Sequence, residues 1–280
     1  MKRYVKIIVS CVYFAVVWLV RSVKQAFGRR TPGLMNVLYY HSVPSNKRAG
    51  FARHMVILAR HAHVVPADWC GATDPARPTV AITFDDAFTS VIDNGLPELA
   101  KRGFPCTIFV PSGVIGRNPD WSMESSADCT SVVVDAARLK ELCGPLVVIG
   151  AHSVSHPRLT GLAPERAREE IAGSRGVLAN LIGAPLTLFA FPYGDYDATV
   201  VEICRQEGFT HVFTIVPEPV DPAACSFVRG RVSVEPDDGA LEFFLKMSGA
   251  YAWMALASAL KRHLQPVIGR ALKIMGPVEE

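Results

Sequence analysis

Hydrophobic and polar positions alternate in a regular rhythm from residue 34 to about residue 232. Short apolar runs of the kind that form buried strands are separated by longer amphipathic stretches with helical spacing. The expected strands are Asn36–Tyr40, His63–Val65, Val80–Phe84, Cys106–Val110, Leu146–Ile149, Leu186–Phe191 and His211–Ile215. The expected helices are Ala49–His61, Ser90–Arg102, Val134–Leu142, Pro164–Leu181 and Tyr196–Glu207. Strands that alternate with helices of this length predict βαβ units and a parallel sheet, and the number of repeats favours an α/β barrel of about seven strands over an open sheet.

Apolar segments also stand at both ends of the chain. Ile7–Val20 is an apolar run of 14 residues between two basic clusters, shorter than the roughly 20 residues of an ordinary membrane-spanning helix. No A-x-A cleavage pattern follows it, so residues 1–30 are expected to form an uncleaved membrane anchor or a helix in the membrane interface. An apolar helix docked on the domain is the alternative. After residue 238 the pattern predicts a C-terminal helical extension over residues 239–276.

Composition and charge narrow the class of protein. Half of the 280 residues are hydrophobic and 20% are charged, which excludes a disordered, collagen-like or coiled-coil chain. The net charge of +3 hides an asymmetry, because residues 1–30 hold seven basic and no acidic residues, which leaves −4 for residues 31–280. A body of that sign without a basic stripe is a poor nucleic-acid binder, so no nucleic-acid partner is expected. Basic residues flank the apolar run on both sides, and the positive-inside rule therefore assigns it no orientation.

Seven cysteines are scattered singly, without a CxxC pair. The spacing predicts reduced thiols that pack as small core residues, rather than a disulfide framework or a metal cluster. Reduced thiols slightly favour the cytoplasmic face of a membrane.

Two adjacent carboxylates, Asp85 and Asp86, end the expected strand Val80–Phe84. Catalytic groups of α/β barrels project from the C-terminal ends of the strands. Two neighbouring acids raise each other's pKa unless a positive charge lies beside them, and a metal cation resolves this by binding one carboxylate and leaving the other ionised as a base. The alternative role for Asp86 is to cap the following helix.

Two histidines, His152 and His156, follow another expected strand and stand four residues apart. This spacing is shared with many zinc sites, whereas a single histidine would be an ordinary core or surface residue. Together with Asp86 they offer two nitrogens and one oxygen, which leaves positions open for water and substrate.

Two further strand ends carry candidate groups. Pro192 and Gly194, on either side of Tyr193, predict a tight turn that can aim a backbone N–H into the site. His41 closes the first expected strand, and histidine is the side chain whose ordinary pKa suits proton transfer near neutral pH. A structural role for His41 is the alternative.

The segments TFDD, HSVSH and FPYG, in this order, together with YYHS before them, resemble the polysaccharide deacetylases, the NodB-homology domain of carbohydrate esterase family 4. The resemblance covers residues 34–235. It extends to the branch that deacetylates exopolysaccharides of the poly-N-acetylglucosamine type, in which a YH strand precedes the TFDD strand. It implies a distorted (β/α) barrel and a metal-dependent hydrolase that removes N-acetyl groups from a sugar in a polysaccharide, an oligosaccharide or a lipid-linked glycan.

The resemblance also implies a role for each matching residue. Asp85 would be the general base, and a divalent metal, zinc first but also cobalt, nickel or iron, would bind Asp86, His152 and His156. The backbone N–H of Tyr193 would face the oxyanion, and His41 would protonate the departing amine. Many members of the family have an arginine that steers the catalytic aspartate where this chain has Ala190, and Arg231 is the candidate replacement, with a surface ion pair as the alternative.

Three other functions fit parts of the pattern. A glycosidase needs two carboxylates about 5–9 Å apart on either side of one bond, which neighbours on a strand do not readily provide. A non-haem iron oxygenase would use two histidines and one carboxylate but would leave Asp85 without a role. The third is a catalytically inactive, membrane-anchored carbohydrate-binding module. Independently of these alternatives, Trp121 of the long irregular segment 111–133 is a candidate to stack on a sugar ring, with a hydrophobic plug as the alternative.

Overall fold

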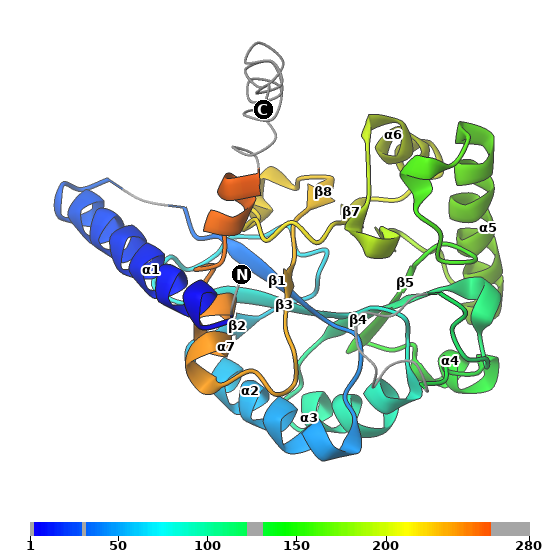
Figure 1. Ribbon diagram of the computed structural model, residues 1–280, viewed down its shortest axis with the longest axis horizontal. Helices are drawn as coiled ribbons and strands as arrows, with labels where there is room; N and C mark the ends of the chain where they lie inside the picture. Colours follow the sequence, from blue (N-terminus) through cyan, green and yellow to red (C-terminus); the bar gives the residue numbers. More distant parts are fainter. Residues whose placement is uncertain (1–2, 30–31, 122–130, 259–280) are drawn as a thin grey trace, which may run out of the picture.

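Nine parallel strands form one curled sheet in the computed structural model, which describes residues 3–29, 32–121 and 131–258 (Figure 1). Eight of them follow the order β8-β7-β6-β5-β4-β3-β1-β9, and β2 pairs with β3. The strands are β1 (Met35–Tyr40), β2 (His63–Val64), β3 (Thr79–Phe84), β4 (Cys106–Val110), β5 (Val147–Ala151), β6 (Leu188–Ala190), β7 (His211–Phe213), β8 (Val228–Arg229) and β9 (Val232–Ser233).

Helices surround the outer face of this sheet, and α1 extends away from the body beside α7 (Figure 1). The α-helices are α1 (Arg3–Ala26), α2 (Arg48–His61), α3 (Leu96–Ala100), α4 (Ala136–Leu142), α5 (Pro164–Ile182), α6 (Ala198–Gln206) and α7 (Ala240–Met247). The short helical turns are η1 (Ser45–Lys47), η2 (Val91–Gly95), η3 (Ser112–Val114), η4 (Leu159–Gly161), η5 (Pro192–Gly194) and η6 (Pro222–Ala224).

The α/β fold with a parallel sheet, predicted from the alternating pattern, is confirmed. Each of the seven expected strands is present, although several bounds shift by one or two residues. The expected helix over residues 90–102 is divided into a π-helical turn, η2, and a short α-helix, α3. Pro97 explains the division, because proline lacks the N–H that would bond to the carbonyl four residues earlier and is tolerated only in the first turn of a helix.

The strands β8 and β9 were missed, and they join the two ends of the sheet order. β8 pairs with β7 and β9 pairs with β1, while only Gly230 and Arg231 separate β8 from β9 in the chain. A β-carbon at position 230 would lie 2.5 Å from the carbonyl oxygen of Val216 and 2.6 Å from that of Glu218, so only glycine fits this close backbone approach. Strands of two residues are too short to show a period, which is why the sequence pattern did not reveal them.

Alternation along the strands separates an inner core from an outer one. On β1, Met35 and Val37 point into the barrel, whereas Leu38 and Tyr40 pack under the surrounding helices. On β3, Ala81 points inward and Ile82 points outward. Because the period of a strand is two, Thr83 and Asp85 continue the inner row toward the C-terminal end of β3.

The N-terminal helix is longer than its apolar run suggested. α1 has 24 residues, a mean hydropathy of 1.8 over its most apolar stretch, and is long and apolar enough to cross a membrane. One face docks on the domain, where Trp253 Nε1 donates to Ser10 Oγ at 2.9 Å and the rings of Phe14 and Phe244 lie 5.9 Å apart. Its other face exposes large apolar side chains to solvent, among them Ile8, Val12, Val16, Trp18 and Leu19.

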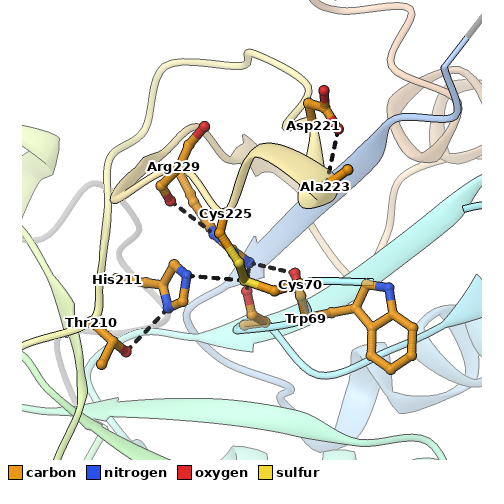
Figure 2. Close-up of a disulfide and its surroundings, with 10 residues drawn as sticks. Trp69, Cys70, Thr210, His211, Asp221, Ala223, Cys225 and Arg229 are labelled. Atoms are coloured by element: carbon orange, nitrogen blue, oxygen red, sulfur yellow. Dashed lines mark hydrogen bonds between the residues drawn. A yellow bond between two sulfur atoms is a disulfide. The ribbon is translucent and has the colours of Figure 1, made fainter. Parts of the chain in front are cut away.

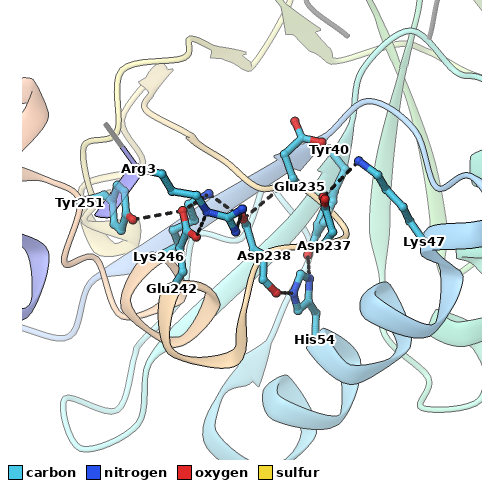
Figure 3. Close-up of polar contacts among 10 residues, drawn as sticks. All are labelled: Arg3, Tyr40, Lys47, His54, Glu235, Asp237, Asp238, Glu242, Lys246 and Tyr251. Atoms are coloured by element: carbon cyan, nitrogen blue, oxygen red, sulfur yellow. Dashed lines mark hydrogen bonds and ion pairs between the residues drawn. The ribbon is translucent and has the colours of Figure 1, made fainter. Parts of the chain in front are cut away.

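A polar cluster fixes the start of α1 to the start of α7 (Figure 3). Arg3 donates to Glu242 at 2.6 Å and to Asp238 at 3.1 Å, and Lys246 donates to Asp238 at 2.6 Å. The two carboxylates are buried, and both cations reach them, so the cluster is internally paired. The expected C-terminal extension begins with α7, while its residues 259–276 lie outside the described part of the chain.

The prediction that all cysteines are reduced was wrong. Cys70 and Cys225 form a disulfide that links the loop after β2 to the end of η6 (Figure 2). Their separation of 155 residues gave no local signal, because only the fold brings these two loops together. Cys106 and Cys204 are buried free thiols, as expected, and Cys143 is exposed. The disulfide removes the reason for favouring the cytoplasmic face.

We expect the Gly230→Ala substitution to destabilise the protein by about 1–3 kcal/mol, because its β-carbon meets backbone atoms that cannot move aside. Gly176, in the middle of α5, is the matched control, since its added β-carbon would meet nothing within 4 Å. Gly176→Ala should stabilise the protein by about 0.5–1 kcal/mol. Urea unfolding followed by circular dichroism measures both, and equal stabilities for Gly230→Ala and the wild type would contradict the tight crossing.

Candidate active site

Asp85 lies on the inner face of the curled sheet, at the C-terminal end of β3. Its backbone N–H donates to the carbonyl of Tyr40 at 2.9 Å, which continues the pairing of β3 with β1 beyond the last strand residue. The inward row of β3 therefore ends in a carboxylate that is only 3% exposed. A buried carboxylate needs a positive partner or a full set of hydrogen bonds to remain ionised.

Arg231 supplies that partner. It is 1% exposed, and its Nη1 and Nη2 donate to the two carboxylate oxygens of Asp85 at 2.7 and 2.9 Å. Burial by itself would raise the pKa of Asp85, but the charge and hydrogen bonds of Arg231 outweigh it and lower that pKa to about 2. The alternative that Arg231 forms a surface ion pair is excluded by its burial.

The guanidinium of Arg231 is held on all sides. Its Nε donates to the carbonyl of Thr214 at 3.1 Å, and Nη1 also donates to Thr83 Oγ1 at 3.2 Å. The ring of Tyr39 lies 4.7 Å from the guanidinium carbon, and the ring of Phe109 lies 5.4 Å away. Arg231 thus makes the contact with Asp85 that was expected of a replacement for the arginine missing at Ala190.

Asp86, His152 and His156 meet beside Asp85. Oδ1 of Asp86 lies 3.7 Å from Nε2 of His152 and 3.5 Å from Nε2 of His156. All three residues are buried, and one ligand atom from each lies within 4.8 Å of the other two. They come from the ends of β3 and β5, so the C-terminal edge of the sheet brings together residues about 70 positions apart.

The histidines present lone pairs to this point. Nδ1 of His152 must donate to the carbonyl of Ala190 at 2.8 Å, because a carbonyl only accepts, and Nε2 is then unprotonated toward Asp86. Burial lowers the pKa of His152 to about 4 and that of His156 to about 2, so both rings are neutral near pH 7. The contacts with Asp86 are therefore not ion pairs. Two imidazole nitrogens and a carboxylate oxygen directed at one point fit a divalent cation, and the bond from His152 to Ala190 is the support that metal-binding histidines usually have.

Left-handed backbone conformations concentrate in the loops of this site. Six non-glycine residues in the described part of the chain have positive φ, and five of them lie here: Asp86 (65°), Ala87 (52°), Ser153 (62°), His156 (58°) and Tyr193 (58°). Such conformations cost of order 1–3 kcal/mol each and persist only where surrounding contacts fix them. Their concentration at one place is typical of a functional site.

Glu170 provides part of that fixation and was not found from the sequence. Its carboxylate accepts from the N–H groups of Val154 and Ser155 at 3.0 and 2.8 Å and from the hydroxyl of Ser155 at 2.8 Å. The loop between the two histidines is thereby tied to α5. In the sequence Glu170 is one of several charged residues of an amphipathic helix, and nothing local indicates that it is buried.

The remaining expected residues also lie at this edge. Tyr193 stands in η5 after β6, with its ring 4.7 Å from that of His156. His41 follows β1 and is close enough that its positive charge would lower the pKa of Asp85 and of both histidines. Trp121 stacks on His156 with ring centroids 4.3 Å apart, so it contacts the site directly. The long segment's residues 122–130 lie outside the described structure.

Comparisons with known proteins agree with this geometry. A family model described as polysaccharide deacetylase matches residues 72–212. YxkH of Bacillus subtilis (strain 168), whose name assigns it to the polysaccharide deacetylases, is 24% identical over an alignment of 216 residues, and the match covers 73% of each protein.

Two solved structures share the fold. IcaB from Ammonifex degensii is 28% identical with a TM-score of 0.63, and the match covers 80% of this chain and 99% of that one. The deacetylase PplD of Streptococcus pyogenes, solved in complex with acetate, has a TM-score of 0.64 at 19% identity and covers 78% of this chain and 99% of its own.

The family match spans half of the chain and contains the segments TFDD, HSVSH and FPYG, while His41 and Arg231 lie on either side of the matched range. With the buried carboxylates and histidines gathered at the C-terminal edge of a curled parallel sheet, the chain belongs to the polysaccharide deacetylase family, hydrolases that act on N-acetyl amide bonds.

Proposed function

We propose that this protein is a metal-dependent hydrolase that removes N-acetyl groups from a sugar in a polysaccharide, an oligosaccharide or a lipid-linked glycan. The observation that carries the proposal is the arrangement of two neighbouring carboxylates with different partners. Asp85 is clamped by Arg231, whereas Asp86 faces two neutral histidines. One acid is thus kept as an ionised base and the other is placed to bind a cation.

Asp86, His152 and His156 would hold a divalent metal, with zinc as the first candidate and cobalt, nickel or iron as alternatives. When bound, such a metal supplies Lewis-acid polarisation of the acetyl carbonyl and acidifies water. The acetamido group would lie next to these three ligands, bordered by Trp121 and Tyr193, whose rings contact that of His156.

Asp85 accepts the proton of the attacking water in this proposal. A carboxylate with a pKa of about 2 is a weak base, so the Arg231 clamp favours fixed orientation and full ionisation over basicity. The backbone N–H of Tyr193 donates to the developing oxyanion from the left-handed turn in η5. His41, at the end of β1, donates a proton to the departing amine.

We further propose that the protein is membrane-associated through α1 and that its catalytic domain works in an oxidising compartment. Residues 1–30 would be the membrane segment, residues 34–235 the catalytic domain, and residues 239–276 an extension whose first helix docks α1. The Cys70–Cys225 disulfide supports the second point, because disulfides persist outside reducing compartments. The order of the YYHS and TFDD segments supports an exopolysaccharide as the substrate class.

The proposed roles of the acids and histidines predict that bound metal and activity can be lost separately in variants of the full-length protein. His152→Ala should lose bound metal together with activity, because it removes a ligand. Asp85→Asn should retain metal while kcat falls by about 10²–10⁴-fold, because it removes the base. Metal content and acetate release from N-acetylglucosamine oligomers and lipid-linked N-acetyl sugars measure both, with His63→Ala on an exposed histidine as the control. A wild-type protein that binds glycans but holds no metal and releases no acetate would instead be a binding module.

Removal of one partner of the buried ion pair should be strongly destabilising. We expect Arg231→Met to lower the free energy of unfolding by about 3–5 kcal/mol, because it leaves the Asp85 carboxylate buried without its counter-charge. The double variant Asp85→Asn/Arg231→Met should recover part of that loss. Urea unfolding of the two single variants and the double variant tests this, and strictly additive losses would show that the two side chains do not act as a pair.

The exposed free thiol of Cys143 reports the side of the membrane. In intact cells, a membrane-impermeant maleimide should label Cys143 if the catalytic domain lies outside the cytoplasm. Cys143→Ser identifies labelling at any other cysteine. Labelling of Cys143 only after the cells are permeabilised would place the domain on the cytoplasmic side.

A further inference from the structure

The disulfide between Cys70 and Cys225 lies away from the candidate active site, beside the guanidinium group of Arg229 (Figure 2). Both cysteines are exposed residues, and they join two loops at the edge of the sheet. Two side chains contact the sulfur of Cys70, one that donates a hydrogen bond and one that presents an unprotonated ring nitrogen. These are Arg229, at the end of β8, and His211, at the start of β7.

Arg229 brings an uncompensated positive charge to this sulfur. Its side chain is fully buried, and it donates to the carbonyls of Ala67 at 2.6 Å and Trp69 at 3.1 Å. Nη2 lies 3.2 Å from Cys70 Sγ. Among the residues that the structure describes, no carboxylate lies within ion-pair distance of Arg229. Asp68 acts on it only from a distance, and burial lowers the pKa of Arg229 to about 10.

His211 presents an unprotonated nitrogen to the same sulfur. The hydroxyl of Thr210 donates to the carbonyl of Thr187 at 3.1 Å, so its oxygen is left to accept from Nδ1 of His211 at 3.1 Å. Nε2 therefore carries a lone pair and lies 3.5 Å from Cys70 Sγ. Burial lowers the pKa of His211 to about 4, so the ring is neutral near pH 7.

We propose that the Cys70–Cys225 pair is a thiol-exchange site that reacts with dithiols, with Cys70 as the activated sulfur. A neighbouring cation stabilises a thiolate, and a stabilised thiolate is the better leaving group when a disulfide is attacked. Within the described part of the chain, the charged and titratable groups that contact Cys70 are Arg229 from β8 and His211 from β7, and Asp68, two residues before Cys70, acts on both of them from a distance. The buried charge of Arg229 dominates, because Asp68 is exposed and screened by solvent.

The exchange proceeds in two balanced steps. A thiolate of the dithiol attacks Cys225 Sγ, a sulfur–sulfur bond forms between them, and the bond to Cys70 breaks with its electron pair on Cys70. The second thiol of the reductant then attacks the mixed disulfide and releases Cys225. The reductant loses two electrons and two protons and closes its own disulfide, while the two cysteines gain those electrons and protons. In the reduced chain, Arg229 Nη2 is placed to donate a hydrogen bond to the Cys70 thiolate.

A metal site is the other chemistry that these groups suggest. After reduction, the sulfurs of Cys70 and Cys225 and a nitrogen of His211 would offer three ligand atoms. The guanidinium of Arg229, however, lies 3.2 Å from one of those sulfurs with its charge uncompensated. This positive charge would repel a bound metal cation, whereas it would stabilise a free thiolate. The arrangement therefore favours thiol exchange over metal binding.

Thiol labelling of the full-length chain tests the proposal without any substitution. The protein is reduced with dithiothreitol, alkylated with iodoacetamide between pH 5 and pH 10, and each cysteine is quantified by peptide mass spectrometry. Cys70 should react at least about 10-fold faster at pH 7 than Cys225, which is also exposed. The midpoint of its pH profile should lie about one unit or more below the ordinary thiol value of about 8.5.

Two further measurements complete the test. A monothiol such as glutathione should form its mixed disulfide on Cys225 rather than on Cys70, because Cys70 is the leaving group. The variant Arg229→Gln should shift the Cys70 profile toward higher pH, because it removes the cation beside the sulfur, while the Cys143 profile stays unchanged. A Cys70 profile that coincides with that of Cys143, or a disulfide that dithiothreitol reduces only after urea unfolds the chain, would overturn the proposal and leave a structural cross-link.

Discussion

The buried ion pair between Arg231 and Asp85 is the contact on which the rest of the structure depends. Arg231 stands in the two-residue link between β8 and β9, the strands at the two ends of the sheet order, while Asp85 ends β3. A buried pair of charges is tolerated only when its hydrogen bonds are complete, and here Thr83 and Thr214 complete them. The same contact therefore fixes the link between β8 and β9 to the end of β3 and keeps the candidate base ionised.

The candidate metal ligands depend on a second constraint, the left-handed backbone of the loops that carry them. Asp86 and His156 both adopt positive φ, which an L-residue does only where its surroundings fix it. The regular sheet and its helices provide that support, and Glu170 of α5 holds the loop between the histidines by three hydrogen bonds. Precise ligand placement thus rests on a buried charge located on a neighbouring helix.

The N-terminal helix α1 is coupled to the same C-terminal edge of the sheet. The carboxylate of Asp238 accepts a hydrogen bond from Arg3 of α1, and the backbone carbonyl of Asp238 accepts one from Nε2 of His54. His54 in turn accepts a hydrogen bond from the hydroxyl of Tyr40, the last residue of β1 (Figure 3). His41 follows directly. The docking of α1 is therefore connected by hydrogen bonds to the strand that carries the proposed general acid.

The sequence by itself determined the local features. The alternating pattern located seven strands, and the carboxylates and histidines after them could be assigned because their chemistry and spacing lie within a few residues. Arg231 was a candidate only through the missing arginine at Ala190. The tertiary structure alone decided its contact with Asp85 across 146 residues, the Cys70–Cys225 bond across 155 residues and the burial of Glu170. These depend on which loops the sheet brings together, and a local pattern of apolar and polar residues carries no information on contacts at that separation.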